Sequence, residues 1–299
     1  MNRNLLTRIK SKFSNFVLPI AGVALLQPAL TFCAAAPPAA PPVTPADIQI
    51  ANSQALRTKA EQLFELGNRA RAAQGISPLQ WDPALAAAAL YHCARVAAEG
   101  PLSHQYAGEP ELSERAGQAG AHFSLIEENI AEGYAPAQIH QMWMNSQGHR
   151  ENLLNPEVDR VGIAVVARGS TLYAVADFGH AVAVLTPEQV ESKVAGLVQA
   201  TGVAARLNST GARIACAQDN GLPVSLDNRR PGFIMRWQDA ELGHLPSALL
   251  DRIATGKYHE ATVASCPSQN AETTFTVYRV AVLLLRTESA PTRTLLSQK

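Results

Sequence analysis

Residues 143–155 of the chain read WMNSQGHRENLLN, a run of mostly polar residues around one histidine, His149. The segment before it opens with Pro136 and repeats apolar residues at helical spacing, which predicts a helix that begins at this proline. Gly148 is expected to end or kink the helix. The pattern therefore places His149 near the end of a helix.

On the C-terminal side of this run the chain changes to a strand pattern. Residues 160–167 (RVGIAVVA) and 172–178 (LYAVADF) are rich in apolar and β-branched residues, and Gly169-Ser170 between them suits a hairpin turn. We therefore expect two antiparallel strands after the helix.

On the N-terminal side, apolar residues at helical spacing over residues 56–70 predict a first helix. Asp82-Pro83 is a strong start signal for a second one, because aspartate caps the first turn and proline fits into it. This second helix is rich in alanine and runs to about Glu99, so we expect its backbone to pack closely against a neighbouring element. Residues 100–135 are expected to form a loop with one short helix around Glu111–Gln118.

Several short motifs accompany the polar run. In chain order they are Gln80–Leu85 (QWDPAL), Leu102–Gln105 (LSHQ), Glu127–Gly133 (EENIAEG), Val161–Ala164 (VGIA) and Asp177–Gly179 (DFG). In this order and spacing they resemble the CAP superfamily of cysteine-rich secretory proteins, antigen 5 and pathogenesis-related proteins, and most of all its bacterial secreted branch. The resemblance covers about residues 56–181. It implies an α+β fold, a three-layer α-β-α sandwich with a central antiparallel sheet.

The resemblance also implies a cleft that gathers two histidines and two acidic residues. His104, Glu128 and His149 match three of these positions by their place in the motifs. Ser146 stands about where many eukaryotic members carry the second acid, and a hydroxyl cannot replace a carboxylate as a charged ligand or base. Asn129 next to Glu128 is interpreted as a turn residue rather than as a hydrogen-bonding group across the cleft.

The chemistry open to this set of residues has several forms. Two imidazoles and a carboxylate can hold zinc or another divalent cation and leave a position for water. Glu128 can instead orient one imidazole through a hydrogen bond, or act as a general base. The alternative without a ligand is a buried polar network that fixes the positions of loops.

Our leading functional hypothesis is a binding protein for a small apolar ligand, a cell-envelope component or another protein, with a divalent cation in the cleft as an additional possibility. The rival is a metal-assisted hydrolase of the peptidase kind, with His104 and His149 as ligands and Glu128 as the catalytic base. The third is a structural envelope module without a site. The chain has no His-Glu-x-x-His, Gly-x-Ser-x-Gly or phosphate-binding loop motif that would indicate another enzyme class.

The N-terminus predicts export. Residues 1–36 carry four basic residues and no acidic one, followed by an apolar run and Ala34-Ala35-Ala36. This is the layout of a secretory signal peptide, so we expect a secreted or periplasmic protein. Lipidation at Cys33 fits poorly, because the bulky Phe32 stands where a small residue is wanted. No later segment is long and apolar enough to span a membrane, so the mature chain is expected to have no span.

Three parts are expected after the leader. Residues 37–50 form an Ala/Pro-rich linker, residues 51–185 the CAP-like domain and residues 187–299 a small β-rich accessory domain. A helix is predicted around Pro187–Ala200. Strands are predicted around Ala212–Ala217, Leu222–Leu226, Gly232–Trp237, Thr262–Cys266 and Thr273–Leu285.

Three cysteines lie beyond the leader. Cys93 shares the apolar face of the alanine-rich helix and is expected to be a buried thiol. Cys216 and Cys266 both fall in predicted strands of the accessory domain. Because an exported chain meets an oxidising compartment, we expect a disulfide between them.

The charge is unevenly distributed along the chain. The 25 basic and 25 acidic residues cancel, which argues against nucleic acid as a partner. The net charge of zero is the sum of three unequal parts. Residues 1–36 have an excess of four positive charges, residues 37–185 an excess of six negative charges and residues 186–299 an excess of two positive charges. The mature chain is therefore expected to be mildly acidic.

Overall fold

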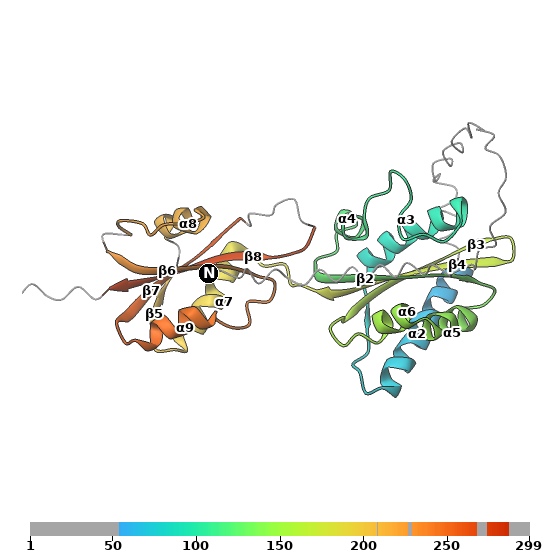
Figure 1. Cartoon of the computed structure of the whole chain (residues 1–299), viewed down its shortest axis with the longest axis horizontal. Helices are drawn as coiled ribbons and strands as arrows, with labels where there is room; N and C mark the ends of the chain where they lie inside the picture. The colour runs from blue at the N-terminus through green and yellow to red at the C-terminus, as the bar shows by residue number, and fades with distance from the viewer. Residues whose placement is uncertain (1–53, 208, 227–228, 268–273, 287–299) are drawn as a thin grey trace, which may run out of the picture. The chain divides into compact units, whose positions relative to one another are not determined.

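The computed structural model describes residues 54–207, 209–226, 229–267 and 274–286 (Figure 1). The expected signal peptide, the linker and Cys33 lie outside the described residues. The chain divides into two compact units, and the boundary along the sequence lies between Ala181 and Val182. Each unit is built on one four-stranded sheet.

The first unit is the predicted α-β-α sandwich. Its sheet has the order β1-β3-β4-β2, formed by β1 (Gln80–Trp81), β2 (Phe123–Gly133), β3 (Arg160–Arg168) and β4 (Thr171–Ala181). Strands β2, β4 and β3 pair antiparallel, and the short β1 pairs parallel to the start of β3. The α+β fold class is confirmed.

Helices cover both faces of this sheet (Figure 1). One face packs against α3 (Pro83–Glu99), with α4 (Leu112–Gln118) beside it. The other face packs against α2 (Gln54–Ala73), α5 (Pro136–Asn145) and α6 (Gln147–Leu153). Trp143 of α5 is the largest fully buried side chain of this second layer.

The second helix begins where the sequence predicts. The side chain of Asp82 accepts hydrogen bonds from the backbone N–H groups of Ala84 and Leu85, and Pro83 follows it in the first turn. The alanine-rich helix also approaches the sheet closely, as expected. A Cβ atom added to Gly162 of β3 would lie 1.9 Å from the backbone nitrogen of Ala86. Only glycine therefore fits at this crossing of α3 and β3.

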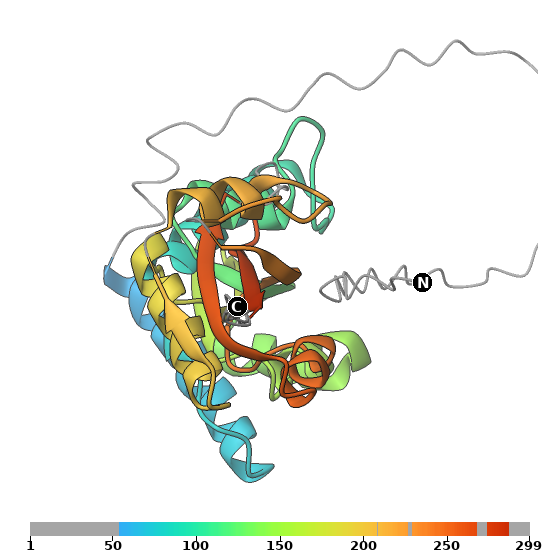
Figure 2. The same ribbon diagram turned by 90° about the vertical axis from the view of Figure 1, so that its left-hand side faces the viewer.

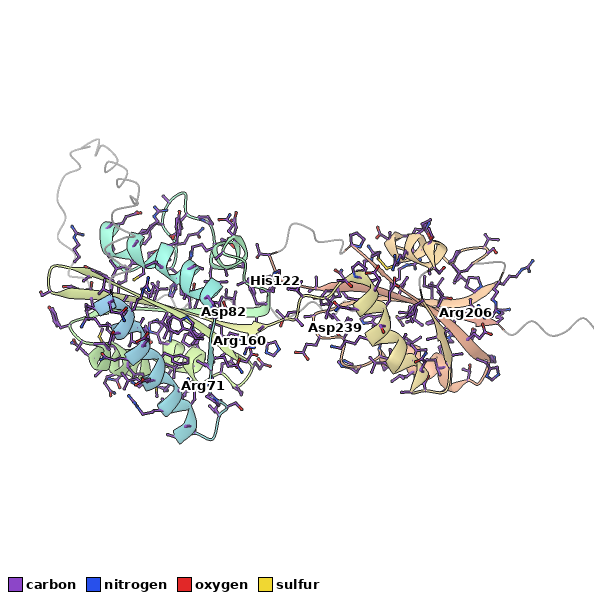
Figure 3. The ribbon with its side chains drawn as sticks, turned by 180° about the vertical axis from the view of Figure 1, so that it is seen from behind. Arg71, Asp82, His122, Arg160, Arg206 and Asp239 are labelled. Carbon is purple, nitrogen blue, oxygen red and sulfur yellow. A yellow bond between two sulfur atoms is a disulfide. The ribbon has the colours of Figure 1, made fainter. Side chains whose placement is uncertain are left out.

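Arg71 joins the second helical layer to the loops below it (Figure 3). Its guanidinium is buried and donates hydrogen bonds to the backbone carbonyls of Ser77, Leu153, Asn155 and Val158. Burial lowers the pKa of Arg71 below its ordinary value. Because the acceptors are neutral carbonyls of several loops, the charge serves to fix the loops rather than to pair with an anion.

Two sequence predictions in this unit are wrong. Residues 123–133, expected as loop, form the edge strand β2, because ten residue pairs with β4 outweigh the low strand propensity of its glutamates. The helix expected to end or kink at Gly148 breaks earlier, at Ser146, and Gly148 lies inside the separate helix α6. The four helices before this break and the hairpin after it were predicted correctly.

The second unit also has helices on both faces of a sheet (Figures 1 and 2). The sheet order is β5-β7-β8-β6, formed by β5 (Ala204–Arg206), β6 (Pro231–Asp239), β7 (Tyr258–Cys266) and β8 (Tyr278–Arg286). One face packs against α8 (Thr210–Ala217). The opposite face packs against α7 (Pro187–Gln199) and α9 (Ser247–Ala254).

The β-rich character of the second unit is confirmed by its sheet, but two of its predicted strands are wrong. Residues 212–217 lie in helix α8, whose first turn is capped by the Ser209 hydroxyl accepting from Ala212 N–H. Residues 222–226 form no strand, and only Leu226 makes an isolated bridge, to Arg229. Helix α9 was not predicted at all, because its eight residues are too few for a clear helical period.

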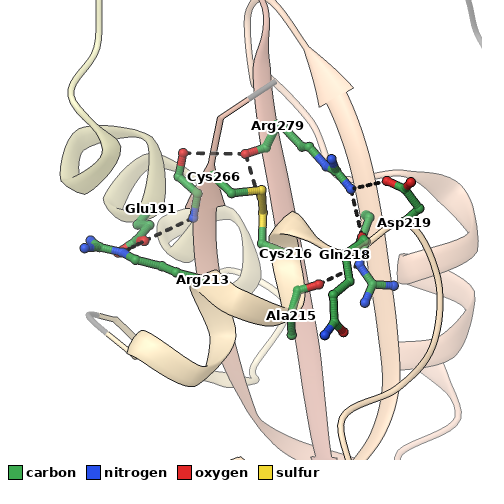
Figure 4. The surroundings of a disulfide bond; sticks show 10 residues. Glu191, Arg213, Ala215, Cys216, Gln218, Asp219, Cys266 and Arg279 are labelled. Atoms are coloured by element: carbon green, nitrogen blue, oxygen red, sulfur yellow. Dashed lines mark hydrogen bonds and ion pairs between the residues drawn. A yellow bond between two sulfur atoms is a disulfide. The ribbon is translucent and has the colours of Figure 1, made fainter. Parts of the chain in front are cut away.

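The disulfide between Cys216 and Cys266 is present and links α8 to β7 (Figure 4). Cys216 therefore lies on a helix, not on the strand expected for it. Beside the bridge, the buried carboxylate of Glu191 accepts from the Arg213 guanidinium and from the backbone N–H of Ser265. The bridge and this ion pair hold α7, α8 and β7 together.

Candidate functional site

Glu128 and His104 lie in direct contact on the face of the sheet covered by α3 and α4. Oε1 of Glu128 is 2.8 Å from Nδ1 of His104, and Oε2 is 2.6 Å from Nη2 of Arg115, which comes from α4. The carboxylate and the guanidinium are buried, whereas the His104 side chain is 44% exposed. Glu128 is therefore an anion held between a buried cation and a histidine at the surface.

These contacts determine the ionisation of Glu128. Burial alone raises the pKa of a carboxyl group, but the hydrogen bond from His104 and the positive charges of His92 and Arg115 lower the pKa of Glu128 below its ordinary value. The Nδ1–H of His104 donates to the carboxylate, which leaves Nε2 as the free ring nitrogen. Of the roles considered from the sequence, the geometry favours Glu128 as the group that orients His104.

A second buried pair lies behind the first. Nδ1 of His92 is 2.7 Å from Oε1 of Glu109, and Nε2 is 3.0 Å from the carbonyl oxygen of Ser103. Both ring nitrogens thus face oxygen atoms. The contacts of His92 with Glu109 and of Arg115 with Glu128 tie residues 103–115 to α3 and β2.

Asp177 is a further buried carboxyl group in this cluster. It lies on β4 directly opposite Glu128 of β2 and is fully buried. Burial and then the negative charge of Glu128 raise the pKa of Asp177 well above its ordinary value. Burial and the neighbouring anion therefore both favour the neutral form of the Asp177 carboxyl group.

Asn129 is not the turn residue that the sequence suggested. It lies in the interior of β2, fully buried, and its Nδ2 donates to the backbone carbonyl of His149 at 2.8 Å. Asn152 of α6 donates in turn to Oδ1 of Asn129 and to the carbonyl of Glu128. The Glu-Asn motif on β2 thus holds α6, and with it His149, against the edge of the sheet.

The ring of His149 lies near the ring of His104. The centroids of the two rings are 6.5 Å apart, and His149 is half-buried. Burial and then the positive charge of His104 lower the pKa of His149 below its ordinary value. Ser146 lies at the junction of α5 and α6, half-buried, and its hydroxyl does not cap α6.

His104, Glu128 and His149 do not fit a three-ligand metal site. Within the described ranges no group of three or more histidine, cysteine, aspartate or glutamate side chains is arranged to hold a metal ion. Both carboxylate oxygens of Glu128 already accept hydrogen bonds from His104 and Arg115. The zinc site and the base role of Glu128 stay predictions, and we derive no chemical step from them.

A groove of about 720 Å³ lies elsewhere on the first unit, between α2, α3 and the edge of β3. The short β1 covers only the first two residues of β3, so the strand edge beyond Val161 lies open on this side in the described part of the chain. The lining is mainly apolar and comes from all three elements, with Leu56, Ala60, Phe64, Ala87, Leu90 and Val165 among its residues. Trp81 also lines the groove and is 38% exposed. Its ring is in edge-to-face contact with the ring of Phe64, with the two ring centroids 5.7 Å apart.

Comparison with known proteins agrees with the fold and the motifs. Residues 64–179 match the model of the family described as CAP, the cysteine-rich secretory protein family. Residues 64–179 form a CAP domain. The match ends in β4, before the first unit gives way to the second.

Two curated relatives of the CAP domain are proteins of Bacillus subtilis. YkwD is 32% identical over 111 residues, which are 37% of this chain and 43% of YkwD. The membrane protein YlbC is 32% identical over 110 residues, which are 36% of this chain and 32% of YlbC. The chain therefore spans less than half the length of either relative.

Solved structures with a similar domain include two bacterial proteins. An extracellular protein of Bacillus anthracis with an SCP domain is 28% identical, with 47% of this chain and 45% of that chain covered and a TM-score of 0.40. A cysteine-rich secretory protein of Staphylococcus aureus is 23% identical, with 42% and 40% covered and a TM-score of 0.36. In the described part of this chain, no helix is long and apolar enough to cross a membrane.

Sequence reasoning missed three members of the polar network in the CAP domain. Glu109 and Arg115 lie in the segment expected as loop and short helix, and nothing in their neighbourhood marks them as buried. Asp177 could have been identified from the sequence, because an acidic residue among the apolar residues of a predicted strand is costly to bury without a partner. The groove was not predicted either, since it depends on how α2 and α3 flank the edge of β3.

Proposed function

We propose that this protein is an exported binding protein whose CAP domain holds a small apolar ligand in the groove between α2, α3 and β3. The observation that carries the proposal is the groove itself. Its volume of about 720 Å³ is in the range of small-molecule sites, and its walls are mainly apolar. Arg57 and Glu61 lie among its lining residues and offer polar contacts for the end of an elongated ligand.

The frame around the groove is rigid, which favours binding without a large ordering cost. Helix α3 is held against β3 by the close contact of Ala86 with Gly162. Helix α2 packs its buried residues Leu56, Ala60 and Leu63 into the core below the sheet. Ala87 on α3 is exposed and lines the groove.

A hydrolase is less well supported by the same domain. Glu128, the proposed base, is buried and engaged by two donors. The thiol of Cys93 is buried, and burial raises its pKa, which makes it a poor nucleophile. In our proposal the network of His92, Glu109, Arg115 and Glu128 fixes the loop after α3 and the helix α6.

The experiment is to purify the natively exported protein and to identify co-purifying small molecules by mass spectrometry after extraction. The test variant is Ala87→Trp, which places an indole in the groove. The matched control is Ala98→Trp, at an exposed position of the same helix outside the groove. We expect an apolar compound with the wild type and the control, and its loss with Ala87→Trp. Equal amounts of compound with all three proteins would contradict the proposal.

A further inference from the structure

Strand β6 forms one edge of the sheet in the second unit, and no described strand pairs with its outer side. Such an edge presents a row of backbone N–H and C=O groups, and proteins normally protect it with charges, bulges or a cover. A bulge of this kind lies at the start of β6, between Pro231 and Phe233, but the regular centre of the strand reads FIMRWQ and holds one charge, Arg236. That guanidinium donates to the backbone carbonyls of Ala215 and Gly221, so it is turned towards α8 rather than along the edge.

Exposed apolar side chains lie in the loop that Arg236 binds. Leu222 and Val224 lie one and three residues after Gly221, and Val224 is 91% exposed. Exposed apolar residues this close together in the chain are typical of a surface that a partner covers.

We propose that this edge pairs antiparallel with β6 of a second copy of the chain, in the register that places Met235 opposite its own counterpart. This register sets Phe233 opposite Trp237 of the second copy, an aromatic pair on one face of the joined sheet. It also sets Ile234 opposite Arg236, so that the two Arg236 side chains do not face each other. A two-fold axis through Met235 relates the copies and closes the assembly as a dimer.

Charge at the two ends of the strand favours a second copy over an unrelated strand. The exposed Arg230 immediately precedes β6, and Asp239 ends it (Figure 3). In the antiparallel register, Arg230 of each copy lies beside Asp239 of the other. The edge is therefore self-complementary in both charge and aromatic pairing.

The first test measures the association of the exported full-length protein by sedimentation equilibrium over a wide range of concentration. We expect a dimer for the wild type. Arg230→Glu and Asp239→Lys should each weaken it about tenfold, because two attractive contacts become repulsive. The double variant restores opposite charges and should recover dimerisation. A wild type that is monomeric throughout, or equal association of all four proteins, would overturn the proposal.

The second test fixes the register and does not depend on the charge variants. Met235→Cys should form a disulfide-linked dimer on mild oxidation, because residues directly opposite in antiparallel strands have Cβ atoms about 5 Å apart. Gln238→Cys is the control, since residue 238 would face residue 232 of the second copy and lie far from residue 238. Equal cross-linking of both variants, or of neither, would contradict the register. Capture of an unrelated extended peptide by this edge in place of a second copy would also overturn the proposal.

Discussion

Nδ1 of His104 lies 2.8 Å from Oε1 of Glu128, and this contact joins the surface of the CAP domain to its buried network. The histidine is held in one orientation, with Nε2 as its free nitrogen. The carboxylate is at the same time the counter-ion of the buried Arg115. The pair therefore supports the structure around His104 and Arg115.

Replacing Glu128 by Gln should destabilise the first unit. The substitution removes the anion that compensates the buried guanidinium of Arg115, and loss of one partner of a buried pair costs about 3 kcal/mol or more. His104→Ala, at a side chain that is 44% exposed, should cost less than about 1 kcal/mol. Urea unfolding followed by tryptophan fluorescence measures both, and equal losses would contradict the counter-ion role.

Asp177→Asn should change the dependence of stability on pH. The pKa of Asp177 is raised in the folded state, so its carboxyl group ionises first in the unfolded chain, from about pH 4 upwards. Ionisation of the unfolded chain lowers the free energy of unfolding as the pH rises towards the folded-state pKa. The variant should match the wild type in acid and become the more stable protein as pH increases. Glu132→Gln, an exposed position of β2, is the control and should leave the pH profile unchanged. Parallel profiles of wild type and Asp177→Asn in urea unfolding would show that the carboxyl group is not held neutral.

Gly162→Ala should disrupt the first unit. The added Cβ would meet the backbone of α3 at 1.9 Å, and a backbone contact cannot move aside as a flexible side chain can. We expect a loss of about 3 kcal/mol or more in the free energy of unfolding. Gly196→Ala in α7, where a Cβ meets no atom within 4 Å, should stabilise by about 0.5–1 kcal/mol. A tolerated Gly162→Ala would mean that α3 lies farther from β3 than described.

Joint replacement of Cys216 and Cys266 by Ala should destabilise the second unit. The bridge closes a loop with a sequence separation of 50, which corresponds to about 4 kcal/mol in the chain-entropy account. Unfolding of the first unit should be unaffected, because neither cysteine belongs to it. Thermal unfolding, with the buried Cys93→Ala as a comparison in the first unit, measures the effect. A shift in the transition of the first unit alone would contradict this assignment.

The sequence predicted the helices and the central hairpin of the first unit because their signals are local. The start of α3 is specified by Asp82-Pro83, and β3 and β4 are specified by two apolar runs around a glycine turn. Strand β2 was not predicted because two of its glutamates find their partners only in the folded chain. Glu128 contacts His104 and Arg115, and Glu127 accepts from Asn155. Helix α8 was mistaken for a strand because most of its eight residues are apolar or small, and packing against the sheet decides its form.

The candidate site was predicted in part. His104, Glu128 and His149 are brought to one region, as the motifs implied, and the contact of His104 with Glu128 is direct. The roles of the residues could not be read from the motifs, because they depend on Arg115, which approaches Glu128 from a separate helix. The position of Asn129 inside a strand likewise follows from its bond to the His149 carbonyl, a contact between residues 20 apart in the chain.

The binding role of the groove is tested most directly by calorimetric titration of dodecanoate, a probe with a single apolar chain and a carboxylate head, into the exported protein and its two α3 variants. The account predicts saturable binding to the wild type and to Ala98→Trp, and binding at least about tenfold weaker to Ala87→Trp. All three proteins should be equally stable in urea, because both substitutions lie at exposed positions of the same helix. Saturable binding of equal strength to all three, or no binding to the wild type, would contradict the account.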